Sequence, residues 1–359
     1  MKKIFLFILD GCAVAPFKTA NTPFMKRLAV EGKSTLECEA IFPTATFSGH
    51  SSILTGTYPD RHGMVGNQFY DRKMKLVKNF DDYNPNDHIQ ALTIFELLLF
   101  PTCAICEPVP KGASTIIKKQ IFDSLPIDQQ NQHIFKELEK LLTLNIKLYV
   151  VNFQGVDGFG ETKGPSSPEY SACLGEVDGF IEAIAKQVQS EFVMLITADH
   201  GMSQLYTESS IEANIDLEME LKKAGFEVKC LASHRMSHLY TESPTKDLES
   251  FLKTRPYIDK VFNQKELERI HLKHERSGDL VVSARKGFEF GEKRLKGSHG
   301  GATKDEMLVP FIIYDSEHES TKGIALSKMN LVDICPTLLD LLNIKPKVKF
   351  QGKSLYKSK

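Results

Sequence analysis

Short apolar runs recur along the chain, and polar or glycine-containing segments separate them. Runs of about four to eight residues that are rich in β-branched and aromatic side chains are typical of buried strands in a parallel sheet. The first run stops at Asp10-Gly11. The predicted strands cover residues 4–9, 34–41, 146–153, 192–197 and 309–314.

Between these runs, apolar residues recur at spacings of three and four and predict helices. One helix should begin at Thr22-Pro23, a pair that suits an N-cap followed by the first helical position. Another should begin at Ser167-Pro168, and a last helix should lie near 331–342. Strands that alternate with helices predict an α/β fold with a mostly parallel central sheet and helices on both faces.

Residues 206–296 differ from the rest because they carry more charge and mixed helix and strand patterns. We interpret them as a smaller inserted α+β cap, or substrate subdomain, and residues 1–205 with 297–359 as the core. The cap contains two closely spaced histidine pairs, His234 with His238 and His271 with His274. No acidic pattern surrounds them, so we interpret all four as solvated surface histidines.

Charge and cysteine content narrow the class of protein. The 359 residues carry 45 basic and 46 acidic side chains, a net charge of -1, so we expect neither nucleic acid nor a membrane as a partner. The N-terminal apolar run is too short for a signal peptide, and no run approaches the ~20 residues of a membrane span. Seven cysteines in a chain of this size do not suggest a disulfide framework, and we expect a cytoplasmic location.

Acidic residues follow three of the predicted strands. Asp10 comes directly after the first, Asp157 shortly after the strand at 146–153, and Asp199-His200 after the strand at 192–197. The carboxyl ends of parallel strands meet at one edge of a sheet, so these side chains should lie together. A single aspartate there is often only a helix N-cap. Three crowded carboxylates, however, repel one another unless cations neutralise them, and carboxylate with imidazole suits Zn²⁺, Mn²⁺ or Fe better than Ca²⁺.

A hydroxyl-rich segment, FPTATFSGH at 42–50, follows the predicted strand 34–41. A hydroxyl at a helix N-terminus lies beside free N–H groups that bind anions, and a nearby metal makes it easier to deprotonate. Thr44, Thr46 and Ser48 are therefore candidate nucleophiles, with a simple N-cap as the alternative reading.

Taken in order, these motifs resemble the alkaline phosphatase superfamily, and in particular its nucleotide pyrophosphatase/phosphodiesterase branch, also named type I phosphodiesterase. Phosphonoacetate hydrolase is a close relative in this resemblance. The motifs span the whole chain: Asp10-Gly11, Phe42 to Phe47 with His50, His62 to Asn67, Thr197 to Met202, Ser298 to Gly301, and Gly352 to Leu355.

The resemblance implies catalysis by two divalent metal ions beside Thr46. Thr46 would be the nucleophile: it would attack phosphorus and form a covalent phospho-threonine intermediate. Asn67 would be a catalytic and substrate-binding donor to a phosphate oxygen, and Phe47 would line the slot for the base or leaving group. One ion would be held by Asp10, Thr46, Asp199 and His200. The second would be held by Asp157, His299 and one more residue. His50 and His62 are interpreted as structural or supporting.

The chain departs from the family pattern at Glu161, which stands where the family has a histidine four residues after Asp157. A glutamate oxygen can also bind a metal, so we predict Glu161 as the remaining ligand. Zn²⁺ is the expected metal, but the added carboxylate would let Mn²⁺ or Mg²⁺ compete. The alternative is a weakened second site.

We therefore expect a hydrolase of phosphoester bonds, a phosphodiesterase or nucleotide pyrophosphatase that acts on a small phosphoester or nucleotide. A neutral Asn67 suits the single charge of a diester. The alternatives are a phosphonoacetate hydrolase or phosphomonoesterase of the same superfamily, or a non-catalytic binder with a degraded second metal site. A Rossmann dehydrogenase is disfavoured because no G-x-G-x-x-G follows the first strand.

Overall fold

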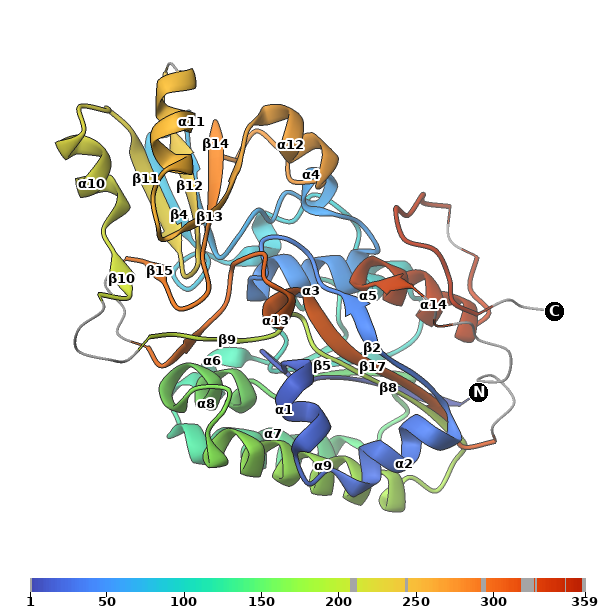
Figure 1. Ribbon diagram of the computed structural model, residues 1–359. Coiled ribbons are helices and arrows are strands. Elements are labelled where there is room, and N and C mark those ends of the chain that lie inside the picture. The colour runs from blue at the N-terminus through green and yellow to red at the C-terminus, as the bar shows by residue number, and fades with distance from the viewer. Residues whose placement is uncertain are drawn as a thin grey trace.

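A large mixed sheet forms the centre of the molecule in the computed structural model (Figure 1). The structure describes residues 2–206, 212–242, 245–291, 295–317, 326, 328–345 and 347–356. The sheet has eight strands in the order β18-β2-β17-β8-β1-β7-β5-β6. They are β1 (Lys3–Ile8), β2 (Lys33–Glu39), β5 (Thr102–Ile105), β6 (Thr115–Ile117), β7 (Leu148–Asn152), β8 (Phe192–Thr197), β17 (Leu308–Asp315) and β18 (Met329–Asn330).

All five predicted strands are present, with small shifts at their ends, and most of the sheet is parallel. The direction predicted for the last one is wrong, because β17 runs antiparallel to both β8 and β2. The chain leaves β8 at the carboxyl edge of the sheet and returns to that edge through β16 (Gly297–Ser298) and α13 (Lys304–Met307). The next strand must therefore run back across the sheet, a constraint that hydrophobicity does not encode.

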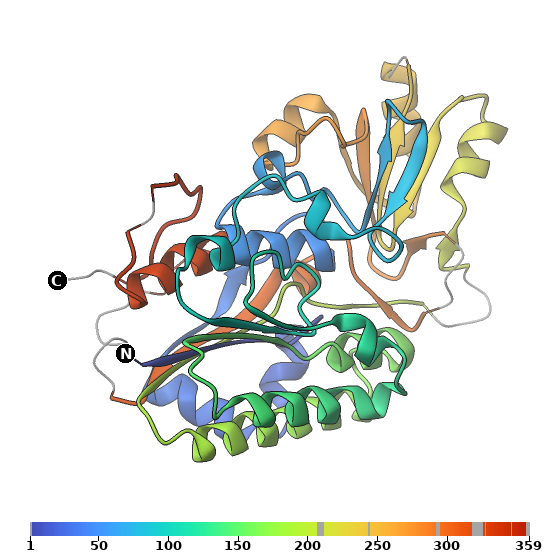
Figure 2. The same ribbon diagram turned by 180° about the vertical axis from the view of Figure 1, so that it is seen from behind.

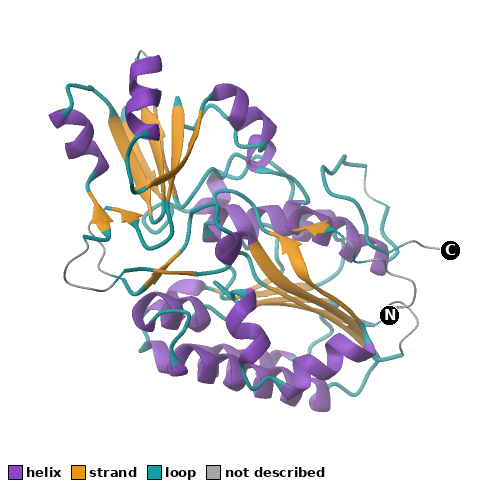
Figure 3. Cartoon of the chain, viewed as in Figure 1, coloured by secondary structure: helices purple, strands orange, loops and turns teal. Residues whose placement is uncertain are grey.

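Helices cover both faces of this sheet, as predicted (Figures 1 and 3). The predicted start at Ser167-Pro168 is confirmed, because Ser167 Oγ accepts the N–H of Tyr170 at 3.2 Å in the first turn. Among the described helices, none is both long and apolar enough to cross a bilayer. One face carries α1 (Val14–Thr19), α2 (Pro23–Glu31), α7 (Ile127–Leu141), α8 (Gly155–Lys163) and α9 (Pro168–Gln187); the other carries α3 (Thr46–Thr55), α4 (Pro59–His62), α5 (Ile94–Leu97) and α14 (Ile334–Leu341).

Much of 206–296 folds as a separate antiparallel sheet with its own apolar cluster. The strand order is β11-β12-β14-β13, and the chain passes to and from it through the paired strands β9 and β16. The cap boundaries stay a prediction. The connecting strand β9 (Ser203–Gln204) lies just before the predicted cap. The elements within 206–296 are β10 (Asn214–Ile215), α10 (Leu217–Lys223), β11 (Lys229–Ser233), β12 (Met236–Tyr240), α11 (Lys246–Lys253), β13 (Ile258–Phe262), α12 (Gln264–Arg269), β14 (Leu280–Ala284) and β15 (Glu289–Phe290).

A hairpin from the first part of the chain packs against this cap sheet (Figure 2). It consists of β3 (Gln68–Asp71) and β4 (Leu76–Asn79). The rings of Tyr70 and Tyr240 lie 5.3 Å apart, and Arg72 Nη2 forms an ion pair with Asp279 Oδ1 at 3.0 Å. The segment directly after Asn67 is therefore fixed by the cap as well as by the core.

Candidate active site

The first pair of carboxylates, Asp10 and Asp199, follows the ends of two neighbouring strands. β1 and β8 are parallel, with Ile8 opposite Thr197, so Asp10 and Asp199 leave the sheet side by side. The N–H of Gly11 donates to Asp199 Oδ1 at 3.1 Å, and Asn152 Nδ2 donates to Asp10 Oδ2 at 2.9 Å. Both aspartates are almost fully buried. The sheet register therefore sets their separation.

His200 completes this first cluster, in which Asp10, Asp199 and His200 each offer a ligand atom within 4.8 Å of the others. Its Nε2 lies 3.2 Å from Asp199 Oδ2 and 3.7 Å from Asp10 Oδ1. Its Nδ1 is 2.9 Å from the carbonyl oxygen of Gly201 and donates to it, which leaves Nε2 turned toward the carboxylates. Two ligands on one tetrahedral ion with bonds of ~2.1 Å are about 3.4 Å apart, so this spacing suits a shared cation.

Thr46 is the hydroxyl that faces this cluster. It is the first residue of α3, after an N-cap at Ala45, and its Oγ1 lies 3.4 Å from His200 Nε2. The other candidate hydroxyls are engaged elsewhere: Thr44 Oγ1 donates to Gly301 O at 2.7 Å, and Ser48 Oγ donates to Met64 O at 2.9 Å. A simple N-cap role is therefore wrong for Thr46.

A second cluster lies beside the first, on α8 and the loop after β16. Asp157 and Glu161 are one helical turn apart, and His299 Nε2 is 3.8 Å from Asp157 Oδ1 and from Glu161 Oε1. His299 Nδ1 donates to Thr44 O at 2.8 Å, so Nε2 is turned toward the carboxylates. The rings of His200 and His299 stack with centroids 3.9 Å apart. The two clusters therefore adjoin.

His234 also reaches the second cluster, and the prediction that it is a solvated surface residue is wrong. Its side chain is 9% exposed, its Nδ1 lies 3.5 Å from Glu161 Oε1, and its ring centroid is 4.3 Å from that of His299. The same prediction is wrong for His238, which is 1% exposed. The turn between β11 and β12 folds over α8, and only tertiary structure brings it there. The one sequence feature that pointed to a further ligand was Glu161, which stands where the family has histidine.

The carboxylates are crowded and buried. Burial, and then the charge of Asp199, raises the pKa of Asp10 to about 7. Burial and Glu161 raise the pKa of Asp157 well above its usual value. No described residue donates a hydrogen bond to Asp10 Oδ1, Asp157 Oδ1 or Asp199 Oδ2. Buried carboxylate oxygens without donors are costly, and divalent cations would remove that cost, so the residues fit two such ions.

His50 supports the first cluster from behind. Its Nδ1 lies 2.8 Å from Glu107 Oε2, and its Nε2 lies 3.6 Å from Asp199 Oδ2. Burial alone would lower the pKa of His50, but the charge and hydrogen bond of Glu107, together with the charges of Asp199 and Asp10, raise it to about 9. The side chain thus places a positive charge behind the carboxylates, in agreement with a supporting role.

One cavity of about 250 Å³ joins the two clusters. Phe47 and Asn67 line it together, with the N–H of Phe47 donating to Asn67 Oδ1 at 3.3 Å. Lys119, from α6 (Lys119–Asp123), lines it too and pairs with Asp123 at 2.7 Å. The cavity shares Phe47 and Lys119 with a neighbouring hollow of about 730 Å³. All the predicted site residues therefore lie in or beneath one cavity, and Lys119 is an addition that no sequence motif indicated.

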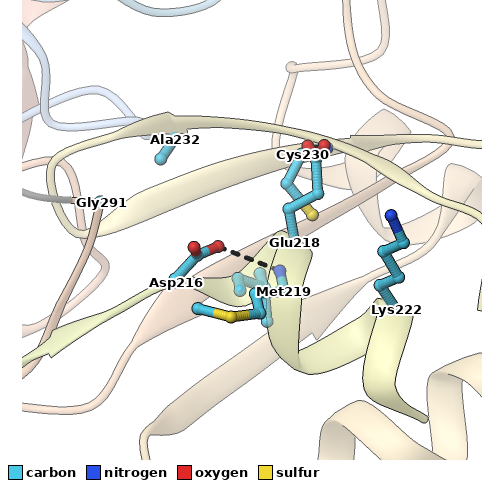
Figure 4. Close-up of a pocket in the computed structure, with 8 residues that line it drawn as sticks. Asp216, Glu218, Met219, Lys222, Cys230, Ala232 and Gly291 are labelled. Carbon is cyan, nitrogen blue, oxygen red and sulfur yellow. Dashed lines mark hydrogen bonds between the residues drawn. The ribbon is translucent and has the colours of Figure 1, made fainter.

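A separate hollow of about 510 Å³ lies beside α10 in the cap (Figure 4). Two of its polar groups serve the local fold, because Asp216 Oδ1 accepts the N–H of Met219 at 3.0 Å and Glu218 Oε2 accepts the N–H of Cys230 at 2.7 Å. None of the predicted site residues lines it. The chemistry of this chain is concentrated in the cavity between the two clusters.

Comparisons with known proteins identify the family of this chain. The family model described as type I phosphodiesterase / nucleotide pyrophosphatase matches residues 4–306. Human bis(5'-adenosyl)-triphosphatase ENPP4 is 23% identical over 375 residues, covering 96% of this chain and 79% of that protein.

Two solved structures share the fold. Murine ectonucleotide pyrophosphatase/phosphodiesterase 5 superposes with a TM-score of 0.79 at 20% identity, covering 98% of each chain. Phosphonoacetate hydrolase from Sinorhizobium meliloti 1021, in complex with phosphonoformate, superposes with a TM-score of 0.76 at 17% identity, covering 93% of this chain and 94% of that chain. Both likenesses extend over almost the whole chain.

Proposed function

The chain belongs to the type I phosphodiesterase and nucleotide pyrophosphatase family and is a hydrolase of phosphoester bonds, and on that premise we propose its reaction. The proposed reaction is cleavage of a phosphodiester or pyrophosphate bond in a small nucleotide, with Thr46 as nucleophile and two divalent cations as cofactors. The observation that carries it is the position of Thr46 Oγ1, 3.4 Å from His200 Nε2 at the first turn of α3.

The two clusters would hold the cations. Asp10, Asp199 and His200, with Thr46, would bind one; Asp157, Glu161 and His299 would bind the other. Bound cations supply charge neutralisation for phosphate oxygens and lower the pKa of oxygen groups beside them. Each cluster offers two carboxylates and one imidazole, a donor set that suits Zn²⁺ and also allows Mn²⁺ or Mg²⁺ to compete.

Thr46 would act in two displacements at phosphorus. In the first, its Oγ1 loses a proton and bonds to phosphorus, the bond to the leaving oxygen breaks, and the leaving group gains a proton. In the second, water attacks the same phosphorus, the bond to Oγ1 breaks, and Thr46 regains its proton. The positive end of the α3 dipole favours the negative charge that builds on the phosphoryl oxygens.

Asn67 would bind a non-bridging phosphate oxygen. Its Oδ1 accepts the N–H of Phe47, so its Nδ2 is the group left to donate to substrate. A neutral amide there suits a phosphodiester, which carries one charge, better than a monoester, which carries two.

A nucleotide substrate is supported by the hollow that adjoins the cavity. Phe47, Phe80 and Tyr83 line it, and aromatic rings of this kind can stack on a base. An inactive variant of murine ectonucleotide pyrophosphatase/phosphodiesterase 5 is known in complex with AMP, and the human relative is named for cleaving bis(5'-adenosyl) triphosphate. Lys119 at the junction would attract the phosphates.

A substrate panel tests the proposal. The wild-type protein would be assayed in Zn²⁺ and in Mn²⁺ with bis-p-nitrophenyl phosphate, p-nitrophenyl phosphate, diadenosine triphosphate and phosphonoacetate. We expect the diester and the dinucleotide to be cleaved with the highest kcat/KM. Faster cleavage of p-nitrophenyl phosphate or phosphonoacetate would favour those alternatives, and no turnover in a metal-loaded protein would favour a binder.

Asn67→Ala should lower kcat/KM for the diester by about 100-fold, the usual scale for one lost donor to a developing charge. The control is Asn263→Ala, because the Asn263 amide likewise accepts a backbone N–H, that of Lys265 at 3.1 Å, and neither residue lines the cavity. An equal loss in both variants would mean that the effect of Asn67→Ala is structural.

A further inference from the structure

His234 enters the second cluster from the cap, on the turn between β11 and β12. Glu161, His234 and His299 each offer one ligand atom, and these atoms all lie within 4.8 Å of one another. His234 also lines the same cavity as Thr46 and Asp157. A residue from the cap therefore lies in the same site as the residues of the core motifs.

The spacing of these groups suits a shared ion. Glu161 Oε1 lies 3.5 Å from His234 Nδ1 and 3.8 Å from His299 Nε2. Both separations exceed the usual 2.7–3.2 Å of an N–H···O hydrogen bond. They approach the ~3.4 Å between two ligands of one tetrahedral ion with bonds of about 2.1 Å.

The fold holds His234 in this place. The next residue, Arg235, is fully buried, and its Nε forms an ion pair with Glu306 Oε1 at 2.9 Å. Its N–H donates to His299 O at 2.8 Å, which ties the turn to the loop that carries another ligand. His234 itself has φ 56°, a left-handed conformation that costs free energy outside glycine, so the surrounding contacts must hold the turn in place.

We propose that His234 is a ligand of the second cation and takes over the role of the histidine that Glu161 replaces. The second site then consists of Asp157, Glu161, His299 and His234, with two carboxylates that balance the charge of a divalent ion. This inference rests on the proposed function only in requiring a cation at the second cluster. Four protein ligands plus a substrate oxygen exceed tetrahedral coordination, which favours Mn²⁺ over Zn²⁺ at this site.

Metal titration of the apo-protein tests this assignment without an activity assay. The variant is His234→Asn, because asparagine tolerates a left-handed backbone and keeps the turn intact. The matched control is His271→Asn: His271 also has a positive φ, 57°, but its side chain is 45% exposed and pairs with Asp60. Calorimetry with Mn²⁺ should resolve two binding events in the wild type and in the control.

In His234→Asn, one event should weaken by roughly 100-fold, at the upper end of the loss seen on removal of groups that support a metal site. The other event should keep its affinity. Asp199→Asn should instead weaken the event that His234→Asn spares, which assigns the two events to the two clusters. A Co²⁺-loaded protein should show a changed visible spectrum in His234→Asn and an unchanged one in His271→Asn.

The titration distinguishes a failure of the His234 assignment from a failure of the proposed function. If both affinities in His234→Asn stay within about twofold of the wild type, the His234 assignment is wrong and the proposed function stands. If the wild-type protein binds no divalent cation, the two-metal reaction is wrong as well.

Discussion

The two candidate metal-binding clusters differ in the elements that form them. The first, Asp10 with Asp199 and His200, arises from the ends of two adjacent parallel strands, and all three side chains are buried. The second combines one face of α8, the loop that carries His299, and a turn of the cap that carries His234. The first cluster belongs to the core alone, whereas the second spans core and cap.

This difference explains where the chain could depart from its family. In the first cluster the register of β1 and β8 sets the positions of Asp10 and Asp199, and the nearest further imidazole, that of His50, is already paired with Glu107. In the second, Glu161 lies at the edge of the cavity, where a residue from another element can approach. We therefore expect a change of ligand type to be tolerated where core and cap meet.

The largest expected effect is at Thr46, which faces the first cluster. Thr46→Ala should lower turnover by about 10⁴-fold or more, because loss of a covalent nucleophile removes the whole displacement pathway. Binding of the second cation should persist, since that cluster does not use this hydroxyl. The measurement is kcat on bis-p-nitrophenyl phosphate beside calorimetry with Mn²⁺.

Thr46→Ser keeps a hydroxyl at the start of α3 and serves as the control, so it should retain far more activity than the alanine variant. Turnover by Thr46→Ala close to that of the wild type would mean that Thr46 is not the nucleophile.

A smaller effect is expected from Glu161→His, which would restore the histidine of the family pattern. Replacing a carboxylate by an imidazole softens the site, so the ratio of Zn²⁺ to Mn²⁺ affinity at the second cluster should rise by about tenfold. Competition titration measures this ratio. Glu169→His, on the exposed first turn of α9, is the control. An unchanged metal preference would show that Glu161 is not a ligand.

A last effect, on stability rather than on catalysis or metal preference, is expected at the contact between cap and core at His238. Its Nδ1 accepts the N–H of Gly278 at 3.1 Å, and its Nε2–H donates to Val65 O at 3.0 Å, so the folded state requires a neutral ring. Burial lowers the pKa of His238 from 6.5 to about 4. As pH falls from 6.5 to 4, the unfolded chain binds a proton that the folded chain excludes, so the free energy of unfolding decreases, by at most about 3 kcal/mol.

His238→Gln can still donate to Val65 but does not titrate, so its free energy of unfolding should depend less on pH over this window. Denaturant unfolding at pH 4.5, 5.5 and 7 measures the difference. Parallel pH profiles for the two proteins would contradict the assignment of a neutral, buried His238.

Much of the fold follows from local pattern. The strand at 192–197 and the helix starts at Thr22-Pro23 and Ser167-Pro168 were predictable because burial periodicity, a proline at the first helical position and, at Ser167, a side-chain cap all act over a few residues. The cap expected from the Thr22 side chain is not made, and proline alone marks that start. The antiparallel direction of β17 was not, since it depends on the edge at which the chain re-enters the sheet. The cytoplasmic location stays a prediction.

The sequence by itself determined the motifs that end the strands and therefore the first cluster, because adjacent parallel strands bring their ends together whatever surrounds them. It also marked Glu161 as a departure. Only the tertiary structure decided what accompanies that glutamate: His234 comes from a segment distant in sequence and folded as part of another sheet. Local patterns specify which atoms could bind a cation, but packing between layers decides which of them meet.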